Sequence, residues 1–309
     1  MEAVFLYAGQ GSQIVGMGKD FYQEYEEYRE FVDSLELDFD FKKIMEEGPM
    51  QELSKTEYTQ PCMAVLAAGI TMLLEKHHIH PKAAMGLSLG EYGALYAAEV
   101  FDAKTYVDIT AHRGKFMAEA AEGLACCMSA ILGCEAKEVE EACKNYNKEG
   151  YVTVANYNCP GQYVICGSSE AVLEVENTLL NTNAKRCVRL QVSGPFHTKY
   201  MEGAGEKLKA YMERIPFQKP RIPVSSNVTG SFYQEHEDLK ARLVEQVKKS
   251  VKLEENLRGM LQAGYDTFIE IGPGNAVSGF LKRTARQMGQ KVTIHIVGTV
   301  EEFKKLIGE

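Results

Sequence analysis

Residues 81–101 read PKAAMGLSLGEYGALYAAEVF, and this stretch decides the fold. Small and apolar residues predict a short strand, Gly86-Leu87-Ser88-Leu89-Gly90 follows as a G-x-S-x-G turn, and the apolar pattern after it predicts a helix. Without β-carbons at positions 86 and 90, the chain can turn sharply enough to lift the Ser88 hydroxyl out of a sheet. This order of elements is the context of a nucleophilic serine, and the free amide of Leu89 at the helix start would stabilise an oxyanion.

The rest of the chain repeats the alternation of strand and helix. AVFLYAG at 3–9 predicts a buried strand before a glycine-rich turn, and DFYQEYEEYREFVDSL at 20–35 has helical periodicity. TQPCMAVLAAGITMLLEKH at 59–77 predicts a core helix with Pro61 in its first turn. Further helices are expected at 103–121, at 199–215 and in a long stretch before 265, and YDTFIEIGPGNAVSGFLKRTAR at 265–286 predicts another strand, glycine turn and helix. This alternation predicts an α/β fold with a parallel sheet.

The pattern changes between about Ala125 and Val192. The segments there predict the order strand, helix, strand, strand, helix, strand, which is the βαββαβ or ferredoxin-like unit. We therefore expect a large α/β domain formed by residues 1–124 and 193–309, with residues 125–192 inserted as a small ferredoxin-like domain.

Composition and charge exclude several functions. The chain has 309 residues, of which 45% are hydrophobic and 25% are charged, and its net charge is -9. These values are ordinary for a globular protein, and the negative charge argues against a nucleic-acid binder. No run reaches the roughly 18 to 20 apolar residues of a membrane span, and no basic region precedes the first apolar run. We expect a cytoplasmic protein with no membrane partner.

Cysteine and histidine clusters do not indicate a metal site. None of the eight cysteines forms a C-x-x-C pair, so we expect reduced thiols that act as small core residues. His77, His78 and His80 form an H-H-x-H cluster at a helix end, where an exposed role is expected because no carboxylate or thiolate completes a ligand set nearby.

Residues that could assist Ser88 are less clear from position alone. His112, His236 and His295 are predicted on a helix, in a polar loop and in an apolar strand, whereas His197 ends a Ser193–His197 loop that enters a helix and could face a cleft. Arg113 lies on a largely apolar helix, where an arginine either reaches water or pairs with an anion. If Arg113 faces the site, its planar guanidinium would bind a carboxylate through two parallel hydrogen bonds.

Several motifs together resemble one family. They are GQGSQ at 9–13, GLSLGEY at 86–92, RGKFM at 113–117, NCPGQ at 158–162, GPFHT at 194–198 and IEIGPG at 269–274. In this order they resemble the malonyl-CoA:acyl-carrier-protein transacylases of fatty-acid synthesis and the acyltransferase domains of polyketide synthases. The resemblance covers nearly the whole chain and implies an α/β-hydrolase-like large domain with a ferredoxin-like insertion.

The resemblance also implies roles for individual residues. Ser88 would be the acylated nucleophile and His197 the general base, oriented by the main-chain carbonyl of Gln246 instead of by an acidic side chain. Arg113 would hold the free carboxylate of a malonyl group. The main-chain amides of Gln10 and Leu89 would form the oxyanion hole. The first glycine-rich turn must therefore approach the elbow, which is the Gly86–Gly90 turn that carries Ser88.

Two positions bear on substrate choice and on packing. A phenylalanine such as Phe196 before the base accompanies malonyl units in the related domains, because its volume leaves little room for a methyl branch. The family usually has a histidine where this chain has Leu87, from which we expect altered packing. The stretch after Gln246 usually contains a proline and a tryptophan, whereas this chain reads KKSVKLEEN and contains no tryptophan.

The implied reaction is malonyl transfer from malonyl-CoA to the phosphopantetheine thiol of an acyl carrier protein by a ping-pong mechanism. Both thiol carriers are substrates, so no cofactor or metal is expected, and the chain would act as a monomer. Because carrier proteins are acidic, a local basic patch should bind the partner. Our candidates are Lys185, Arg186, Arg189, Lys282 and Arg283.

Other functions remain open at this stage. The chain could serve a polyketide pathway, or it could be a serine acyl hydrolase of the same fold, although a hydrolase has no need for the arginine grip. A dinucleotide-binding protein is disfavoured because Ile14 stands where the third glycine of the fingerprint should fall. A scaffold without activity would not need Ser88, His197 and Arg113 together.

Overall fold

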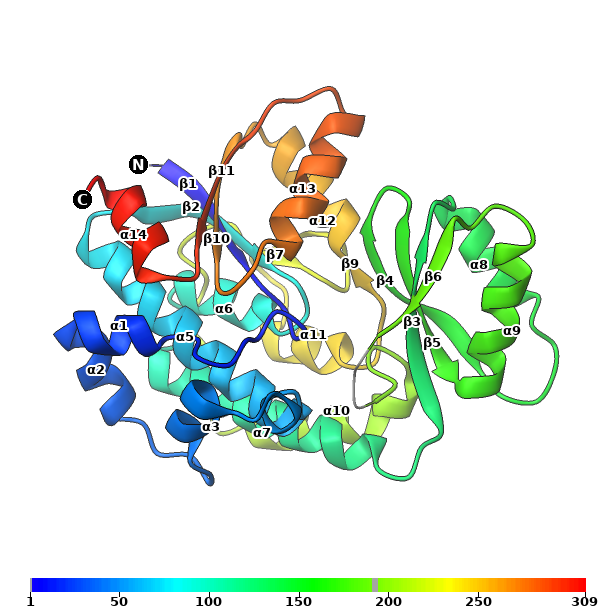
Figure 1. Ribbon diagram of the computed structural model, residues 1–309, viewed down its shortest axis with the longest axis horizontal. Coiled ribbons are helices and arrows are strands. Elements are labelled where there is room, and N and C mark those ends of the chain that lie inside the picture. Colours follow the sequence, from blue (N-terminus) through cyan, green and yellow to red (C-terminus); the bar gives the residue numbers. More distant parts are fainter. Residues whose placement is uncertain (1, 191–193) are drawn as a thin grey trace.

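The computed structural model describes residues 2–190 and 194–309. A large α/β domain lies beside a smaller domain of four strands and two helices, and the two chain ends lie close together on the large domain (Figure 1). The predicted fold class is confirmed. The expected boundary between residues 192 and 193 lies outside the described residues.

The sheet of the large domain is parallel, as the sequence predicts. Its strands, in spatial order, are β11 (Thr293–Val297), β10 (Thr267–Ile271), β1 (Glu2–Tyr7) and β2 (His80–Gly86). β1 pairs in parallel with both β10 and β2, and β10 pairs in parallel with β11. The carboxyl ends of β1 and β2 therefore lie side by side, and this is the edge at which parallel sheets place their ligands.

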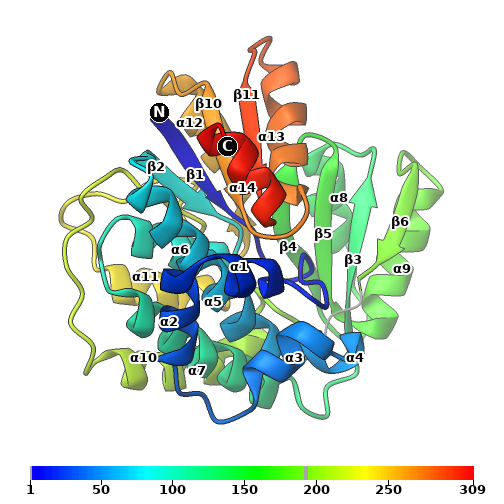
Figure 2. The same cartoon turned by 60° about the vertical axis from the view of Figure 1, so that its left-hand side comes forward.

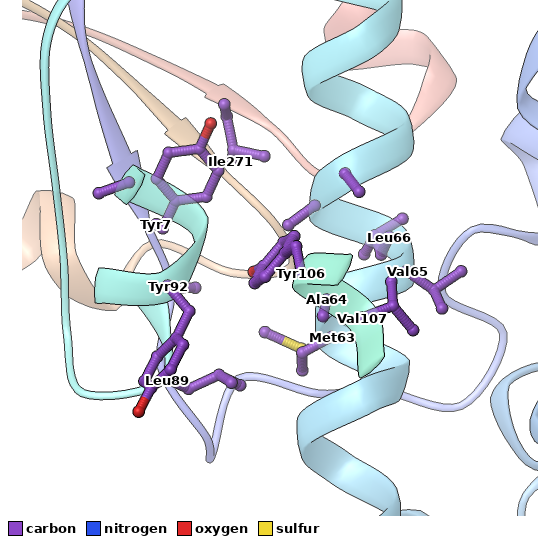
Figure 3. Packing of buried hydrophobic residues seen from close by; sticks show 14 of the residues in the cluster. Tyr7, Met63, Ala64, Val65, Leu66, Leu89, Tyr92, Tyr106, Val107 and Ile271 are labelled. Atoms are coloured by element: carbon purple, nitrogen blue, oxygen red, sulfur yellow. The ribbon is translucent and has the colours of Figure 1, made fainter. Parts of the chain in front are cut away.

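Helices cover both faces of this sheet. Phe5 and Tyr7 of β1 belong to a core with α5 (Thr56–Lys76), α6 (Gly90–Ala97) and α7 (Ala103–Ala121). Val4 and Leu6 belong to a second core with α12 (Leu253–Gln262) and α13 (Ala276–Gln287). Alternate residues of a strand point to opposite faces, which explains why β1 is apolar throughout. Figure 3 shows part of the first core, with Tyr106 of α7 beside the α5 side chains and Tyr7 of β1 next to Ile271 of β10.

The remaining helices surround the first core (Figure 2). They are α1 (Lys19–Glu24), α2 (Glu26–Asp33), α3 (Phe41–Glu47), α4 (Met50–Leu53), the 3₁₀ turn η1 (Lys199–Met201), α10 (Glu202–Met212), α11 (Leu239–Gln246) and α14 (Val300–Ile307). Two short strands, β7 (Ser225–Ser226) and β8 (Ser231–Phe232), form a hairpin.

The small domain has the predicted βαββαβ order. Its elements are β3 (Cys126–Leu132), α8 (Ala136–Lys144), β4 (Val152–Cys159), β5 (Gln162–Ser168), α9 (Ser169–Leu180) and β6 (Arg186–Arg189). These strands pair antiparallel in the order β6-β3-β5-β4. The large domain adds β9 (Val251–Lys252), which pairs in parallel with β4. This strand fixes the segment after α11 against the small domain.

Three helix predictions need correction. The helix expected over 20–35 is broken at Tyr25, whose extended backbone separates α1 from α2. Pro61 lies inside α5, not in its first turn, because the helix already begins at Thr56. The long helical stretch before 265 is two helices separated by β9, because residues 247–252 leave the helix to pair with the small domain.

The elbow between β2 and α6 is packed directly against the end of β1. Leu87 N–H donates to the Tyr7 carbonyl at 3.1 Å. A β-carbon on Gly90 would lie 2.2 Å from the same Tyr7 carbonyl oxygen, a distance that real atoms do not reach. The glycine is therefore required by the neighbouring strand, and the expected close approach of the first turn to the elbow is present.

We predict that Gly90→Ala destabilises the protein by about 3 kcal/mol, because the added methyl group must displace main-chain atoms of β1. The measurement is the free energy of unfolding from denaturant titration. Gly279→Ala is the matched control, since Gly279 lies in α13 with open space around its Cα. That change should stabilise the protein by up to about 1 kcal/mol. Equal stability of the two variants would contradict this account of the elbow.

Candidate active site

Ser88 occupies the turn between β2 and α6. Its φ of 54° lies in the left-handed region, which a residue with a side chain rarely adopts. A β-carbon on Gly86 would lie 2.1 Å from the main-chain carbon and oxygen of Gly90, so the two ends of the turn nearly touch. This tight turn leaves the Ser88 side chain half-buried at the carboxyl edge of the sheet.

His197 lies within hydrogen-bond distance of Ser88. Its Nε2 is 2.7 Å from Ser88 Oγ, and its Nδ1 is 2.8 Å from the main-chain oxygen of Gln246. A carbonyl oxygen only accepts, so Nδ1 carries the proton and Nε2 presents its lone pair to the serine hydroxyl. The arrangement makes His197 the group that can take the Ser88 proton.

The end of α11 supplies the partner of His197. Gln246 is the last residue of this helix, and the last carbonyls of a helix have no partner within it. The Gln246 carbonyl accepts from the imidazole, and the next carbonyl, of Val247, accepts from the His197 main-chain N–H at 3.1 Å. The negative end of the helix dipole would favour the imidazolium that forms when His197 takes a proton.

His197 is buried and stays neutral at ordinary pH. Only 4% of it is exposed, and burial, followed by the nearby Arg113 guanidinium, lowers the pKa of His197 from 6.5 to about 4. Both causes disfavour the protonated ring. The imidazole is therefore in the form that can accept a proton.

Arg113 projects from α7 into the same place and is buried, with 1% of it exposed. Its Nη2 donates to Ser88 Oγ at 3.0 Å and to the side-chain oxygen of Gln246 at 2.9 Å, and its Nη1 donates to the side-chain oxygen of Gln60 at 2.7 Å. Across residues 2–190 and 194–309, no carboxylate lies within 4 Å of the guanidinium. The arginine is thus a buried cation surrounded by neutral acceptors.

The remaining predicted residues lie around this centre. In the described chain the main-chain N–H groups of Gln10 and Leu89 donate no hydrogen bond, and the Gln10 side chain is tied to Thr56 at 2.9 Å. Phe196 precedes His197 and is buried, with 6% exposed. Leu87 is partly buried and packs on the second core.

Sequence reasoning missed four residues that hold the site. Gln60 accepts from Arg113, and buried Glu91 and Asn227 form a hydrogen-bonded cluster with partly buried Tyr233 beneath the elbow. Glu91 directly follows the G-x-S-x-G motif, so its position could have drawn attention. The other three come from distant segments and carry no local signal.

The other candidate groups do not join the site. The ring of His112 stacks on Tyr211, with centroids 3.8 Å apart, and His236 is exposed. His295 is half-buried in β11, the apolar strand in which it is predicted. All eight cysteines are free thiols. Across the described residues, no cluster of His, Cys, Asp or Glu could hold a metal ion, and no helix is long and apolar enough to cross a membrane.

A cavity of about 310 Å³ opens beside His197 at the junction of the two domains. It is lined by Tyr151, Thr153, His197, Val228, Lys248, Lys249, Ser250 and Lys252. The segment after α11 is held here by a hydrogen bond of 2.6 Å from Ser250 Oγ to the Val154 carbonyl of the small domain. Both domains therefore shape the approach to the serine and histidine.

This chain is similar in sequence to known proteins over nearly its whole length. Residues 4–305 match the model of the acyl transferase domain. The malonyl CoA-acyl carrier protein transacylase of Bacillus subtilis (strain 168) is 36% identical over 287 residues, which cover 92% of this chain and 90% of that protein. The corresponding enzyme of Staphylococcus aureus (strain MRSA252) is 33% identical over 306 residues, covering 98% of this chain and 97% of that protein.

Solved structures agree over the whole chain. The malonyl CoA-acyl carrier protein transacylase from Clostridium perfringens has a TM-score of 0.92 and 36% identity, covering 100% of this chain and 96% of that one. A malonyl-transacylase in complex with its type II PKS acyl-carrier protein has a TM-score of 0.89 and 30% identity, with 100% of both chains covered.

We predict that the reactivity of Ser88 falls only near pH 4, where His197 becomes protonated, and not near 6.5. The measurement is the rate at which phenylmethylsulfonyl fluoride modifies Ser88, followed by intact mass as a function of pH. Replacing Arg113 by Met removes a cation that lowers the pKa of His197. The acid limb, which is the fall in modification rate on the acid side of the pH profile, should therefore move to higher pH.

Lys115→Met is the control for this shift, because Lys115 is an exposed cation on the same helix. It should leave the limb in place. A wild-type limb at 6.5 would show that burial does not lower the pKa of His197, and equal limbs for the wild type and Arg113→Met would show that the guanidinium does not contribute to the shift.

Proposed function

This chain belongs to the acyl transferase family, and on that premise we propose that it transfers a malonyl group from malonyl-CoA to the thiol of an acyl carrier protein. The relatives at 33% to 36% identity that carry this activity in their names cover nearly the whole chain. The fold and the acyltransferase class are those of the family.

One observation supports this function above others. Ser88 Oγ is contacted both by His197 Nε2, at 2.7 Å, and by Arg113 Nη2, at 3.0 Å. A base can activate the hydroxyl, and a buried guanidinium lies beside it with no protein carboxylate paired to it among the described residues. The pair suits an acyl group that carries a free carboxylate, since a guanidinium fork matches that group in geometry and charge.

The first half-reaction acylates Ser88. His197 Nε2 takes the hydroxyl proton as Ser88 Oγ attacks the thioester carbonyl carbon of malonyl-CoA, and the carbonyl oxygen becomes an oxyanion. We assign its stabilisation to the free main-chain amides of Gln10 and Leu89. The carbon–sulfur bond then breaks, and the imidazolium returns the proton to the leaving coenzyme A thiolate.

The second half-reaction reverses these roles. The phosphopantetheine thiol of the carrier protein gives its proton to His197, and its sulfur attacks the malonyl-serine ester. The carbon–oxygen bond breaks, the proton returns to Ser88 Oγ, and the malonyl thioester leaves. Both halves use the same serine, histidine and oxyanion donors, so we propose that the reaction needs no cofactor.

Phe196 is our candidate for excluding branched acyl groups. It is buried directly before the base, and its ring would crowd a β-carbon added at Gly194, at 3.0 Å. This dense packing leaves the ring little freedom to move aside. A methyl branch at C2 is disfavoured by about 1 to 3 kcal/mol in such a pocket.

The carrier arm would reach the site through the 310 Å³ cavity beside His197. Lys248, Lys249 and Lys252 line it, and each pairs with a glutamate, so a phosphate of the arm would compete with these glutamates for the lysines. These lysines belong to the KKSVKLEEN stretch that departs from the family pattern.

The carrier protein itself would dock on exposed basic residues. The five candidates fall into two groups, since Lys185, Arg186 and Arg189 lie on the β6 edge of the small sheet whereas Lys282 and Arg283 lie on α13 beside β4 (Figure 2). Arg189 is already paired with Glu176 at 2.6 Å. One partner would therefore engage one group, not a single continuous patch. The monomeric state and the cytoplasmic location remain predictions.

We predict that wild-type protein mixed with malonyl-CoA gains the mass of one malonyl group, and that Ser88→Ala does not. Arg113→Ala should load malonyl about 100-fold more slowly, a cost of about 3 kcal/mol, because a buried carboxylate loses its partner. The same variant should load acetyl from acetyl-CoA at a rate close to that of the wild type.

The outcomes separate the alternatives. If malonyl and acetyl loading fall equally in Arg113→Ala, the carboxylate grip is wrong. If the adduct forms but is released by water as fast as by a carrier-protein thiol, the chain is a hydrolase. If wild-type protein gains no adduct, the proposed function itself fails.

A second prediction concerns the coupling between the substrate and the base. A malonyl carboxylate bound to Arg113 neutralises the cation that helps to lower the pKa of His197, so the base should strengthen once this substrate is bound. The acid limb of kcat for acylation should then lie at higher pH than the limb of kcat/KM. Acetyl-CoA should show no such separation, and an equal separation for both acyl groups would rule out the coupling.

A further inference from the structure

Glu91 is a fully buried carboxylate that the reaction described above does not use. It is the second residue of α6, with 0% exposed, and no cation lies within 4 Å of it in the described chain. Its Oε1 accepts from the Tyr233 hydroxyl, and its Oε2 accepts from Asn227 N–H at 3.1 Å and from Gln246 Nε2 at 2.7 Å. The β7–β8 hairpin and the end of α11, both at least 136 residues from Glu91 in the chain, thus meet at one side chain.

Asn227 connects Glu91 to the nucleophile. Its side-chain oxygen accepts from Ser88 N–H at 2.7 Å, and its side-chain nitrogen donates to the Gly86 carbonyl at 2.8 Å. These two bonds hold the peptide groups on both sides of Leu87, where the backbone enters the left-handed conformation of Ser88. Because the Asn227 main-chain N–H donates to Glu91, the carboxylate holds Asn227 in the position from which its side chain bonds to the elbow.

Gln246 connects Glu91 to the base and to the arginine. Its Nε2 donates to Glu91 and to the Ser88 carbonyl at 2.8 Å, both of which are acceptors. The amide can therefore point only one way, with its oxygen toward Arg113. The main-chain carbonyl of the same residue accepts from His197, so one residue sets the orientation of both groups that contact Ser88 Oγ.

We propose that Glu91 is a positioning residue, whose side chain aligns the nucleophile through Asn227 and the base and the arginine through Gln246. The inference rests on the proposed nucleophilic role of Ser88. Glu91 touches no reacting atom, and its effect passes through two amide side chains.

The acceptor geometry of Glu91 matters more than its charge. Burial raises its pKa to about 7, and the ionisable groups around it are Arg113 from α7, Tyr92 on its own helix and Tyr233 beyond β8. When protonated at Oε1, the carboxyl can donate to the Tyr233 oxygen while Oε2 still accepts both N–H groups. A glutamine can do the same, with its amide nitrogen facing Tyr233.

The experiment measures the rate at which phenylmethylsulfonyl fluoride modifies Ser88 in the whole chain, by intact mass. Glu91→Ala should slow this reaction about 100-fold, since small displacements of reacting groups have effects of that size. Glu91→Gln should restore a rate within a few-fold of the wild type. The probe needs no malonyl group, so a chain that reacts with it but not with malonyl-CoA would refute the proposed function and leave this inference standing.

Glu270→Ala serves as the matched control. Glu270 is also fully buried and accepts two main-chain N–H groups, of Val277 and Ser278, so its loss should destabilise the fold comparably. Rates are compared per folded molecule, with the folded fraction taken from near-ultraviolet circular dichroism. The inference is overturned if Glu91→Ala reacts as fast as the wild type, if Glu91→Gln is as slow as Glu91→Ala, or if Glu270→Ala is slowed equally.

Discussion

The hydrogen bond between His197 Nδ1 and the main-chain carbonyl of Gln246 is the contact on which the site depends. It fixes the tautomer, so that the lone pair of Nε2 faces Ser88, and it does so without an acidic side chain. A helix end can take this role because its last carbonyls have no partner inside the helix. The position of the base therefore depends on where α11 ends, and β9, which begins at Val251, fixes that segment against the small domain. The domain interface and the catalytic geometry are set by the same segment.

The sequence predicts those parts of the site whose requirements are local. The elbow can be recognised because its conformation needs glycine at 86 and 90 and a strand and a helix around it, and all of these lie within one short stretch. The parallel sheet and the βαββαβ domain follow from periodicity alone, since each strand and helix carries its own apolar pattern. His197 and Arg113 lie 109 and 25 residues from Ser88 in the chain. The sequence shows that His197 could face a cleft and that Arg113 lies on an apolar helix, but no pattern in it brings them together, and only the family resemblance assigned their roles.

Long-range contacts explain the predictions that failed and the residues that were missed. The break at Tyr25 and the interruption between α11 and α12 occur in segments with sustained helical periodicity, where packing on other elements decides the outcome. Asn227 is an ordinary loop asparagine in the sequence. Its role in the site comes from its hydrogen bonds to the main chain of Gly86 and Ser88. Glu91 resembles an N-terminal helix carboxylate, a common stabilising residue. Its complete burial and its three donors become apparent only once the fold is known.

Arg113 shows why neutral acceptors surround the site. A buried guanidinium is costly unless it is hydrogen-bonded, and Gln60, Gln246 and Ser88 provide those bonds without cancelling its charge. A carboxylate in their place would form a stable ion pair, and an incoming substrate carboxylate would have to displace it. Glu91 lies close enough to favour the charged arginine but is separated from it by the Gln246 amide, which bonds to both. The guanidinium of Arg113 is thus desolvated mostly when the protein folds, not when the substrate binds. The substrate carboxylate therefore meets a cation that is already in position and is not paired with a protein carboxylate.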